Sequence, residues 1–138
     1  MYEDRIEITF DAGHRLLKYR GKCDVPHGHT YKAEIMLSSE KLDQMGFVVD
    51  FLELKDKVGQ WVDENWDHAF LVNERDEELL RALNSLSEKK IFVFSSTNPT
   101  AEAMAKYLYE YVHELYGDLV SKVRIWESQN QYAEYLER

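Results

Sequence analysis

The chain has 138 residues, enough for one domain with its own core, and 44% hydrophobic and 31% charged residues are typical of a soluble globular protein. Its net charge of −9 argues against nucleic acid or an anionic membrane as a partner, and no apolar run approaches the roughly 20 residues of a membrane span. The single cysteine excludes an internal disulfide, and the N-terminus has no apolar signal core, so we expect a cytoplasmic protein.

The first predicted element is a strand over residues 5–14, where polar and apolar residues alternate as in a half-buried strand. A second strand begins at His27 and His29 and continues through apolar residues of the same parity. Residues two apart project to one side of an extended chain, so His14 shares a face with the apolar residues of the first strand. If the two strands pair antiparallel, the three imidazoles can converge on one sheet face.

The residue patterns in the middle of the chain predict strands and helices in alternation. Residues 47–49 suggest a short strand, and Asp50 fits the cap of a helix that should end near Asn65. Leucines between residues 74 and 89 indicate a second, short helix. The β-rich run 91–94 predicts a buried strand.

A longer helix is predicted after this strand. Asn98 followed by Pro99 fits an N-cap and a first helical residue, and the helix should run from about Thr100 to Tyr116, with Gly117 as its stop. We expect its buried face to contain Met104, Ala105, Leu108, Val112 and Leu115.

The chain should finish with a hairpin formed by residues 122–127 and 132–136. Glu127 continues the parity of Val123 and Ile125 and should therefore point to the apolar side. A buried carboxylate needs hydrogen-bond donors. Two partners fit: an arginine, or a ligand that offers two parallel N–H groups to the carboxylate.

The histidines of the first two strands predict a metal site. Three imidazoles from His14, His27 and His29 suit a Zn²⁺ ion that keeps its fourth position open, as catalytic zinc does. No second thiol or acidic cluster favours another ion. His113 lies among acids and tyrosines in the predicted long helix, and we assign it a structural role.

Three further features each have a functional and an ordinary interpretation. Cys23 is either a small buried residue or, beside cations and a metal, a thiolate that removes a proton. Asp67 and His68 can form a proton relay if a turn brings their side chains together, and otherwise belong to an ordinary loop. The basic residues between 12 and 23 are either solvated charges or a phosphate-attracting rim beside the metal.

These candidate residues fall within motifs that follow one another in the order of a known family. The motifs are Phe10-Asp-Ala-Gly-His14-Arg15-Leu, Cys23-x-x-x-His27-Gly28-His29, Val49-Asp50-Phe51-x-x-Leu54-Lys55, Asp67-His68, Pro99-Thr100-x-Glu102 and Trp126-Glu127-Ser128. Over nearly its whole length the chain thus resembles the 6-pyruvoyl-tetrahydropterin synthase family, which includes the 6-carboxytetrahydropterin synthase of queuosine biosynthesis.

The resemblance implies one tunnelling-fold domain over residues 1–138, of the α+β class. This fold has a four-stranded antiparallel sheet with two main helices on one face. The segment 73–96 is longer than in compact family members and should add a short helix. Family members assemble as trimers stacked into hexamers with active sites between subunits, so we expect a homo-oligomer.

The resemblance also implies roles for the motif residues. Zinc would be held by His14, His27 and His29; Cys23 would be the base, with Asp67 and His68 completing its relay; Glu127 would bind the pterin edge, aided by Thr100 and Glu102. Asp50 would cap a helix.

The activity that the resemblance implies is that of a zinc-dependent lyase acting on 7,8-dihydroneopterin triphosphate. The three residues between Cys23 and His27 resemble the carboxy-forming branch, which releases acetaldehyde and triphosphate and leaves a 6-carboxylate. One alternative is a 6-pyruvoyl-tetrahydropterin synthase or a related enzyme that cleaves the pterin side chain. Another is a pterin- or metal-binding oligomer without catalysis.

Overall fold

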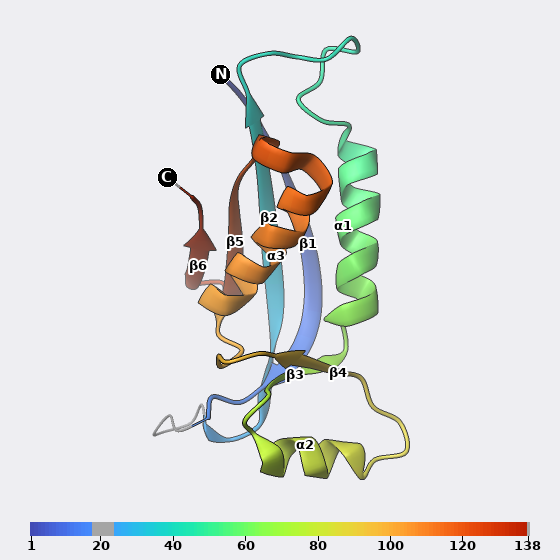
Figure 1. Cartoon of the computed structure of the whole chain (residues 1–138), viewed down its shortest axis with the longest axis vertical. Helices are drawn as coiled ribbons and strands as arrows, with labels where there is room; N and C mark the ends of the chain where they lie inside the picture. Colours follow the sequence, from blue (N-terminus) through green and yellow to red (C-terminus); the bar gives the residue numbers. More distant parts are fainter. Residues whose placement is uncertain (18–23, 138) are drawn as a thin grey trace.

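The computed structural model describes residues 1–17 and 24–137, which form a curved sheet flanked by helices (Figure 1). The strands are β1 (Tyr2–His14), β2 (His27–Ser39), β3 (Ala69–Asn73), β4 (Ile91–Phe94), β5 (Val120–Ser128) and β6 (Gln131–Tyr135). The helices are α1 (Phe51–Asn65), α2 (Glu77–Asn84) and α3 (Ala101–Tyr116), with a 3-10 turn, η2 (Gly117–Leu119), after α3.

The sheet has the strand order β4-β3-β1-β2-β5-β6. The β1–β2, β2–β5 and β5–β6 pairs are antiparallel, as predicted for four strands, but β3 pairs with β1 and β4 with β3 in parallel. The prediction of a purely antiparallel four-stranded sheet is therefore wrong in this detail. Residues 69–73 follow α1 almost directly, and no alternation in the sequence marks them as a strand.

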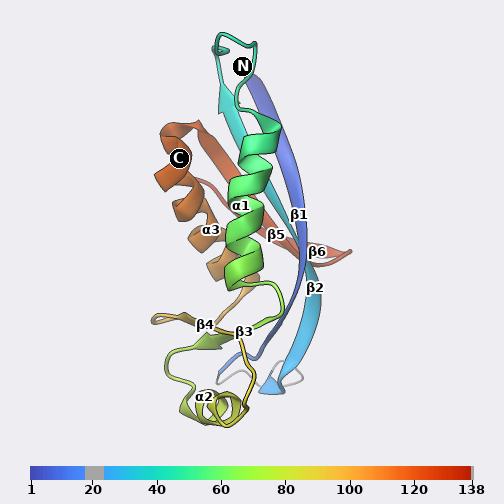
Figure 2. The same cartoon turned by 90° about the vertical axis from the view of Figure 1, so that its right-hand side faces the viewer.

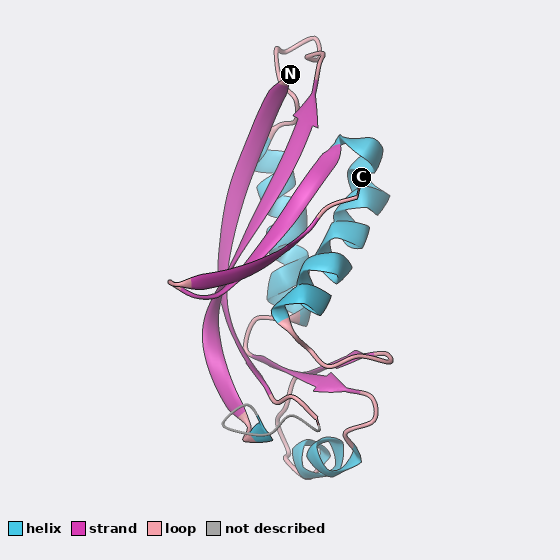
Figure 3. Cartoon of the chain, turned by 90° about the vertical axis from the view of Figure 1, so that its left-hand side faces the viewer, coloured by secondary structure: helices cyan, strands magenta, loops and turns pink. Residues whose placement is uncertain are grey.

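Two helices cover one face of the long strands. α1 packs on β1, and α3 packs on β5 and β6. Figure 2 and Figure 3 show both helices on the same side of the sheet, with α2 near the end of the molecule where β3 and β4 lie. None of the helices in the described part of the chain combines the length and the hydropathy needed to cross a bilayer.

The alternation predicted for the first two strands is confirmed. Along β1 the buried side chains are Ile6, Phe10, Ala12 and His14, with Ile8 partly buried, and they share the face that the helices cover. Phe10 lies opposite Tyr31 of β2, and their rings stack with centroids 5.2 Å apart. The face that carries the histidines is thus an extension of the hydrophobic core.

Other local predictions are partly confirmed. α1 is capped by Asp50, whose side chain accepts from the Leu52 and Glu53 N–H groups, and Gly117 ends α3. The short helix predicted between residues 74 and 89 is α2. Residues 47–49 form no strand, although Val48 and Val49 are buried in the core, because their burial comes from packing rather than from pairing.

The start of α3 differs from the prediction. Its N-cap is Thr100, whose hydroxyl oxygen accepts from the Ala103 N–H at 3.1 Å, and not Asn98. Leu115 is exposed instead of buried, while the other four residues predicted for the buried face lie in the core. The amide of Asn98 is instead bonded to two other segments, as described below.

Candidate functional site

The three histidines converge as their spacing predicted. His14 pairs with His27 across β1 and β2, and Ala12 pairs with His29, so the three side chains leave neighbouring positions of one sheet face. Their ring centroids are 4.7 to 5.2 Å apart, and one nitrogen from each ring lies within 4.8 Å of the other two.

Backbone carbonyls fix the tautomer of two of these rings. His14 Nδ1 lies 2.7 Å from the Pro99 carbonyl oxygen, and His27 Nδ1 lies 2.7 Å from that of Val25. A carbonyl only accepts, so each Nδ1 carries the hydrogen and each neutral ring keeps its lone pair on Nε2. Second bonds of this kind are typical of histidines that bind metals.

The free nitrogens face one another. His14 Nε2 and His27 Nε2 are 3.2 Å apart, and His29 Nε2 is buried with no hydrogen-bond partner among the described residues. Burial also lowers the pKa of His14 and of His29 below the ordinary value of 6.5, which favours neutral imidazoles. Imidazole nitrogens that gather with free lone pairs are typical ligands of a divalent metal ion, so these residues fit such an ion.

Two side chains border this cluster. Tyr31 is fully buried, and its hydroxyl lies 3.4 Å from His14 Nδ1. Burial raises the pKa of the Tyr31 hydroxyl, which therefore stays protonated. The sequence placed Tyr31 on the histidine face, but only the packing shows that it contacts His14.

Glu127 reaches the cluster from β5. Its Oε1 lies 3.6 Å from His29 Nε2, and no arginine of the described residues lies within ion-pair distance of it. Glu127 and Glu102 line a cavity of about 170 Å³ between the start of α3 and the β5–β6 hairpin, together with Tyr132. Two carboxylates thus border a small hollow beside the imidazoles. Glu34, by contrast, is a buried acid of this sheet that does pair with an arginine, Arg5.

Asp67 and His68 form a hydrogen-bonded pair, because the chain turns sharply after α1. His68 has a positive φ of 59°, which bends the two adjacent side chains toward each other, and His68 Nδ1 lies 3.0 Å from Asp67 Oδ2. Asp67 also accepts from the Asp11 N–H at 3.0 Å. Although burial acts to raise the pKa of Asp67, the hydrogen bonds from Asp11 and His68 hold it below its ordinary value.

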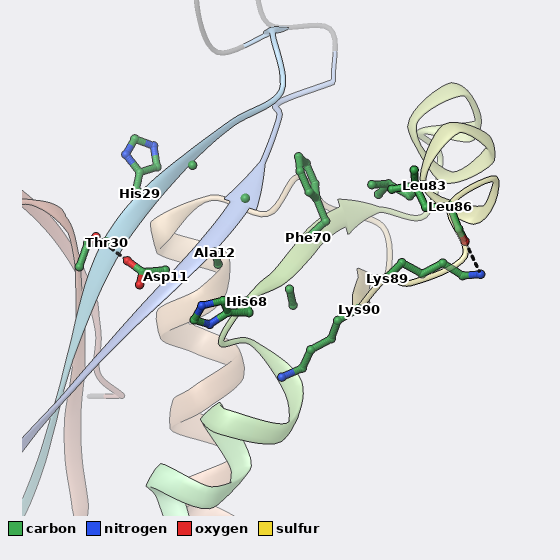
Figure 4. Close-up of a pocket in the computed structure, with 13 residues that line it drawn as sticks. Asp11, Ala12, His29, Thr30, His68, Phe70, Leu83, Leu86, Lys89 and Lys90 are labelled. Atoms are coloured by element: carbon green, nitrogen blue, oxygen red, sulfur yellow. Dashed lines mark hydrogen bonds between the residues drawn. The ribbon is translucent and has the colours of Figure 1, made fainter.

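This pair lies at a cavity that also reaches the histidine cluster. His68 is exposed and borders a cavity of about 550 Å³, which Figure 4 shows in close-up. The cavity lining includes His29 of the cluster as well as Gly13 and Thr30, whose positions alternate along β1 and β2 with those of the histidines. Within one chain, His68 and His29 therefore border the same cavity.

The remaining candidates are placed in part. Cys23 lies outside the described residues, as do Lys18, Arg20 and Lys22 of the basic stretch. Arg15 of that stretch bonds to Asp76 through two nitrogens at 2.6 Å, so the prediction that it belongs to a phosphate-attracting rim is wrong. The acids that neutralise Arg15 lie in α2 and at its N-cap. They are far from Arg15 in the sequence, so no local pattern indicated this pairing.

Comparisons with known proteins match the chain over nearly its whole length. A family model described as 6-pyruvoyl tetrahydropterin synthase matches residues 5–138. A Rickettsia felis protein named 6-carboxy-5,6,7,8-tetrahydropterin synthase is 35% identical over 134 residues, covering 92% of this chain and 94% of the relative. A Haemophilus influenzae protein of the same name is 32% identical over 143 residues, covering 99% of this chain and all of the relative.

Solved structures share the fold. An uncharacterised protein of Wolinella succinogenes superposes with a TM-score of 0.83 at 23% identity, over 99% of this chain and 98% of that one. The Caenorhabditis elegans 6-pyruvoyl tetrahydropterin synthase superposes with a TM-score of 0.72 at 24% identity, over 99% and 96% of the two chains.

Proposed function

Because the chain belongs to the 6-pyruvoyl tetrahydropterin synthase family, we propose that it is a zinc-dependent lyase of the 6-carboxytetrahydropterin synthase type. It would convert 7,8-dihydroneopterin triphosphate into 6-carboxy-5,6,7,8-tetrahydropterin, with release of acetaldehyde and triphosphate. The observation that carries this proposal is the cluster of three imidazoles with Nε2 atoms directed at one another.

His14, His27 and His29 would hold the zinc. Neutral imidazole suits Zn²⁺, and three protein ligands leave a position for a reactant. The bound ion supplies Lewis acidity toward the oxygens of the substrate side chain. The Pro99 and Val25 carbonyls keep two of the rings in the tautomer that binds a metal through Nε2.

Proton transfer would be carried out by Cys23 and the Asp67–His68 pair. Cys23 as a thiolate would take a proton from carbon, and His68, oriented by Asp67, would pass protons on. Since His68 is exposed, we propose that it serves a site completed by a second copy. This favours a homo-oligomer, a trimer or a hexamer, with active sites between subunits.

Glu127 would bind the pterin. Its carboxylate lies beside His29 and faces a cavity, so it can accept from two parallel N–H donors next to the metal. Glu102 borders the same cavity. Thr100 uses its oxygen to cap α3 but keeps its hydroxyl hydrogen, which can donate to a ligand at this helix start.

The proposal is tested by incubating the purified protein with Zn²⁺ and 7,8-dihydroneopterin triphosphate and identifying the products by mass spectrometry. We expect 6-carboxytetrahydropterin and acetaldehyde. A 6-pyruvoyl product would assign the chain to the other branch of the family. Retention of zinc and pterin without turnover would favour the binding protein instead.

A further inference from the structure

Asn98 joins three segments beside the histidine cluster, although it is neither the helix cap that its sequence suggested nor a residue of the cavities. Its Oδ1 accepts from the Leu17 N–H at 2.9 Å, and its Nδ2 donates to the Leu17 carbonyl at 3.1 Å. The side chain of Asn73 also donates to Asn98 Oδ1, at 3.0 Å. Asn98 thus connects the end of β1, the end of β3 and the entry to α3.

The chemistry of these partners determines the orientation of the amide. The Leu17 N–H only donates and its carbonyl only accepts, so oxygen faces the first and nitrogen the second. The two lone pairs of Oδ1 then accept from the Leu17 N–H and from the Asn73 side chain. Asn98 bonds both the N–H and the carbonyl of Leu17, as the backbone of a neighbouring strand does. An asparagine satisfies this pattern, while a residue without both a donor and an acceptor cannot.

The same region holds the first zinc ligand. Leu17 lies three residues after His14, and Pro99, which follows Asn98, supplies the carbonyl that accepts from His14 Nδ1. Asn98 therefore ties together the two backbone segments between which the His14 ring is placed. Loss of the amide would break the bonds between the two segments. The His14–Pro99 hydrogen bond would then no longer be supported by this frame, that is, by the bonds of Asn98 to Leu17.

A second connection strengthens this frame. Asn73, held by Asn98, starts the turn that leads to Asp76: its carbonyl accepts from the Asp76 N–H at 2.9 Å. Asp76 in turn binds Arg15, the residue that follows His14. Two tethered residues, Arg15 and Leu17, thus follow closely after His14, and both tethers lead back to the amide of Asn98.

We propose that Asn98 is a positioning residue for the metal ion: it sets the distance between the His14 segment and the Pro99 carbonyl and so aims His14 Nε2 at the other two imidazoles. This inference rests on the metal-binding part of the proposed function. Outer partners of metal ligands typically contribute about 10- to 100-fold to metal affinity. Asn98 acts one step further from the metal than such a partner, so we expect a loss at the lower end of that range, about 10-fold, when Asn98 is replaced.

The test is a Zn²⁺ titration of metal-free protein in competition with a chromophoric chelator, on wild type, Asn98→Ala and Asn65→Ala. Asn65 is the matched control, because it is also half-buried and makes a 2.9 Å amide bond to the Trp61 carbonyl within α1. Circular dichroism melts of the metal-free proteins measure any general loss of stability.

We expect Asn98→Ala to bind Zn²⁺ about 10-fold more weakly and Asn65→Ala to stay within about twofold of wild type, at similar melting temperatures. An affinity of Asn98→Ala within about twofold of wild type would overturn the inference alone, as would an equal loss in Asn65→Ala. If the wild type itself fails to bind Zn²⁺, the proposed function and the inference both fall.

A second variant covers the case in which Asn98→Ala does not fold. Asn73→Ala removes one of the three hydrogen bonds of the Asn98 amide and leaves the pairing with Leu17 intact. It should lower Zn²⁺ affinity by a smaller factor than the alanine at 98, and an affinity equal to wild type would contradict the proposed frame. Replacement of Zn²⁺ by Co²⁺ adds a visible spectrum that reports the ligand geometry directly.

Discussion

Removal of the metal should destabilise the protein by an amount that depends on the ratio of the Zn²⁺ concentration to its dissociation constant. With Zn²⁺ at about 100 times its dissociation constant, binding to the folded state alone adds about 2.7 kcal/mol to the free energy of unfolding. For a chain of this size, about 1 kcal/mol shifts the melting temperature by about 3 to 5 °C. We therefore expect Zn²⁺ to raise the melting temperature by about 8 to 13 °C over chelator-treated protein.

His29→Ala separates this effect from an unspecific one. In the metal-free protein His29 Nε2 is buried without a partner among the described residues, and such a group costs about 1 to 3 kcal/mol. Loss of the ring removes that cost together with its packing, so metal-free His29→Ala should be about as stable as metal-free wild type. It should gain little from Zn²⁺, because only two imidazoles remain.

Differential scanning calorimetry of the two proteins, each with Zn²⁺ and with chelator, measures all four melting temperatures. A wild type whose melting temperature does not respond to Zn²⁺ would refute the metal centre. The reasoning about His29 would be refuted if the variant gained as much as the wild type, since the stabilising ion would then bind elsewhere.

Three further predictions concern single side chains. Cys23→Ala should retain Zn²⁺ and fold but lose turnover of dihydroneopterin triphosphate, and substantial remaining activity would exclude Cys23 as the base. Glu127→Ala should weaken pterin binding, measured by fluorescence titration, by a few kcal/mol, and an unchanged affinity would leave Glu127 a structural residue. The Arg15 guanidinium holds the pKa of Asp76 below its ordinary value of 3.8, so this ion pair stabilises the fold above that pH and is lost as pH falls below it. Asp76→Asn, which can still cap α2, should therefore lower the free energy of unfolding by about 3 kcal/mol at neutral pH, and urea unfolding should show the difference shrinking between pH 5 and pH 2; a constant difference would contradict it.

Much of the local structure followed from patterns over short distances in the chain. The period-two alternation of β1 and β2 predicted that His14, His27 and His29 share a face, and the antiparallel register confirmed it. The cap at Asp50 and the stop at Gly117 were also correct, because both depend on residues within one helical turn.

Errors arose where a distant partner decides the conformation. Asn98-Pro99 has the local features of a helix start, yet the amide of Asn98 bonds to Leu17 across 81 residues, and Thr100 takes the cap. Residues 69–73 became a strand because β1 offered a free edge for parallel pairing. The Arg15 side chain binds two carboxylates that lie 61 and 63 residues further along the chain, and it was predicted to attract a phosphate instead.

For this chain, the sequence by itself indicated which side chains are candidates for the chemistry, since residue type and spacing along a strand specify both donor atoms and the face they share. Tertiary structure alone decided the tautomers set by the Pro99 and Val25 carbonyls, the place of His68 at a cavity that His29 also lines, and the bonds of Asn98. These properties depend on contacts between segments that are brought together only when the core is packed, and no local pattern in the chain encodes them.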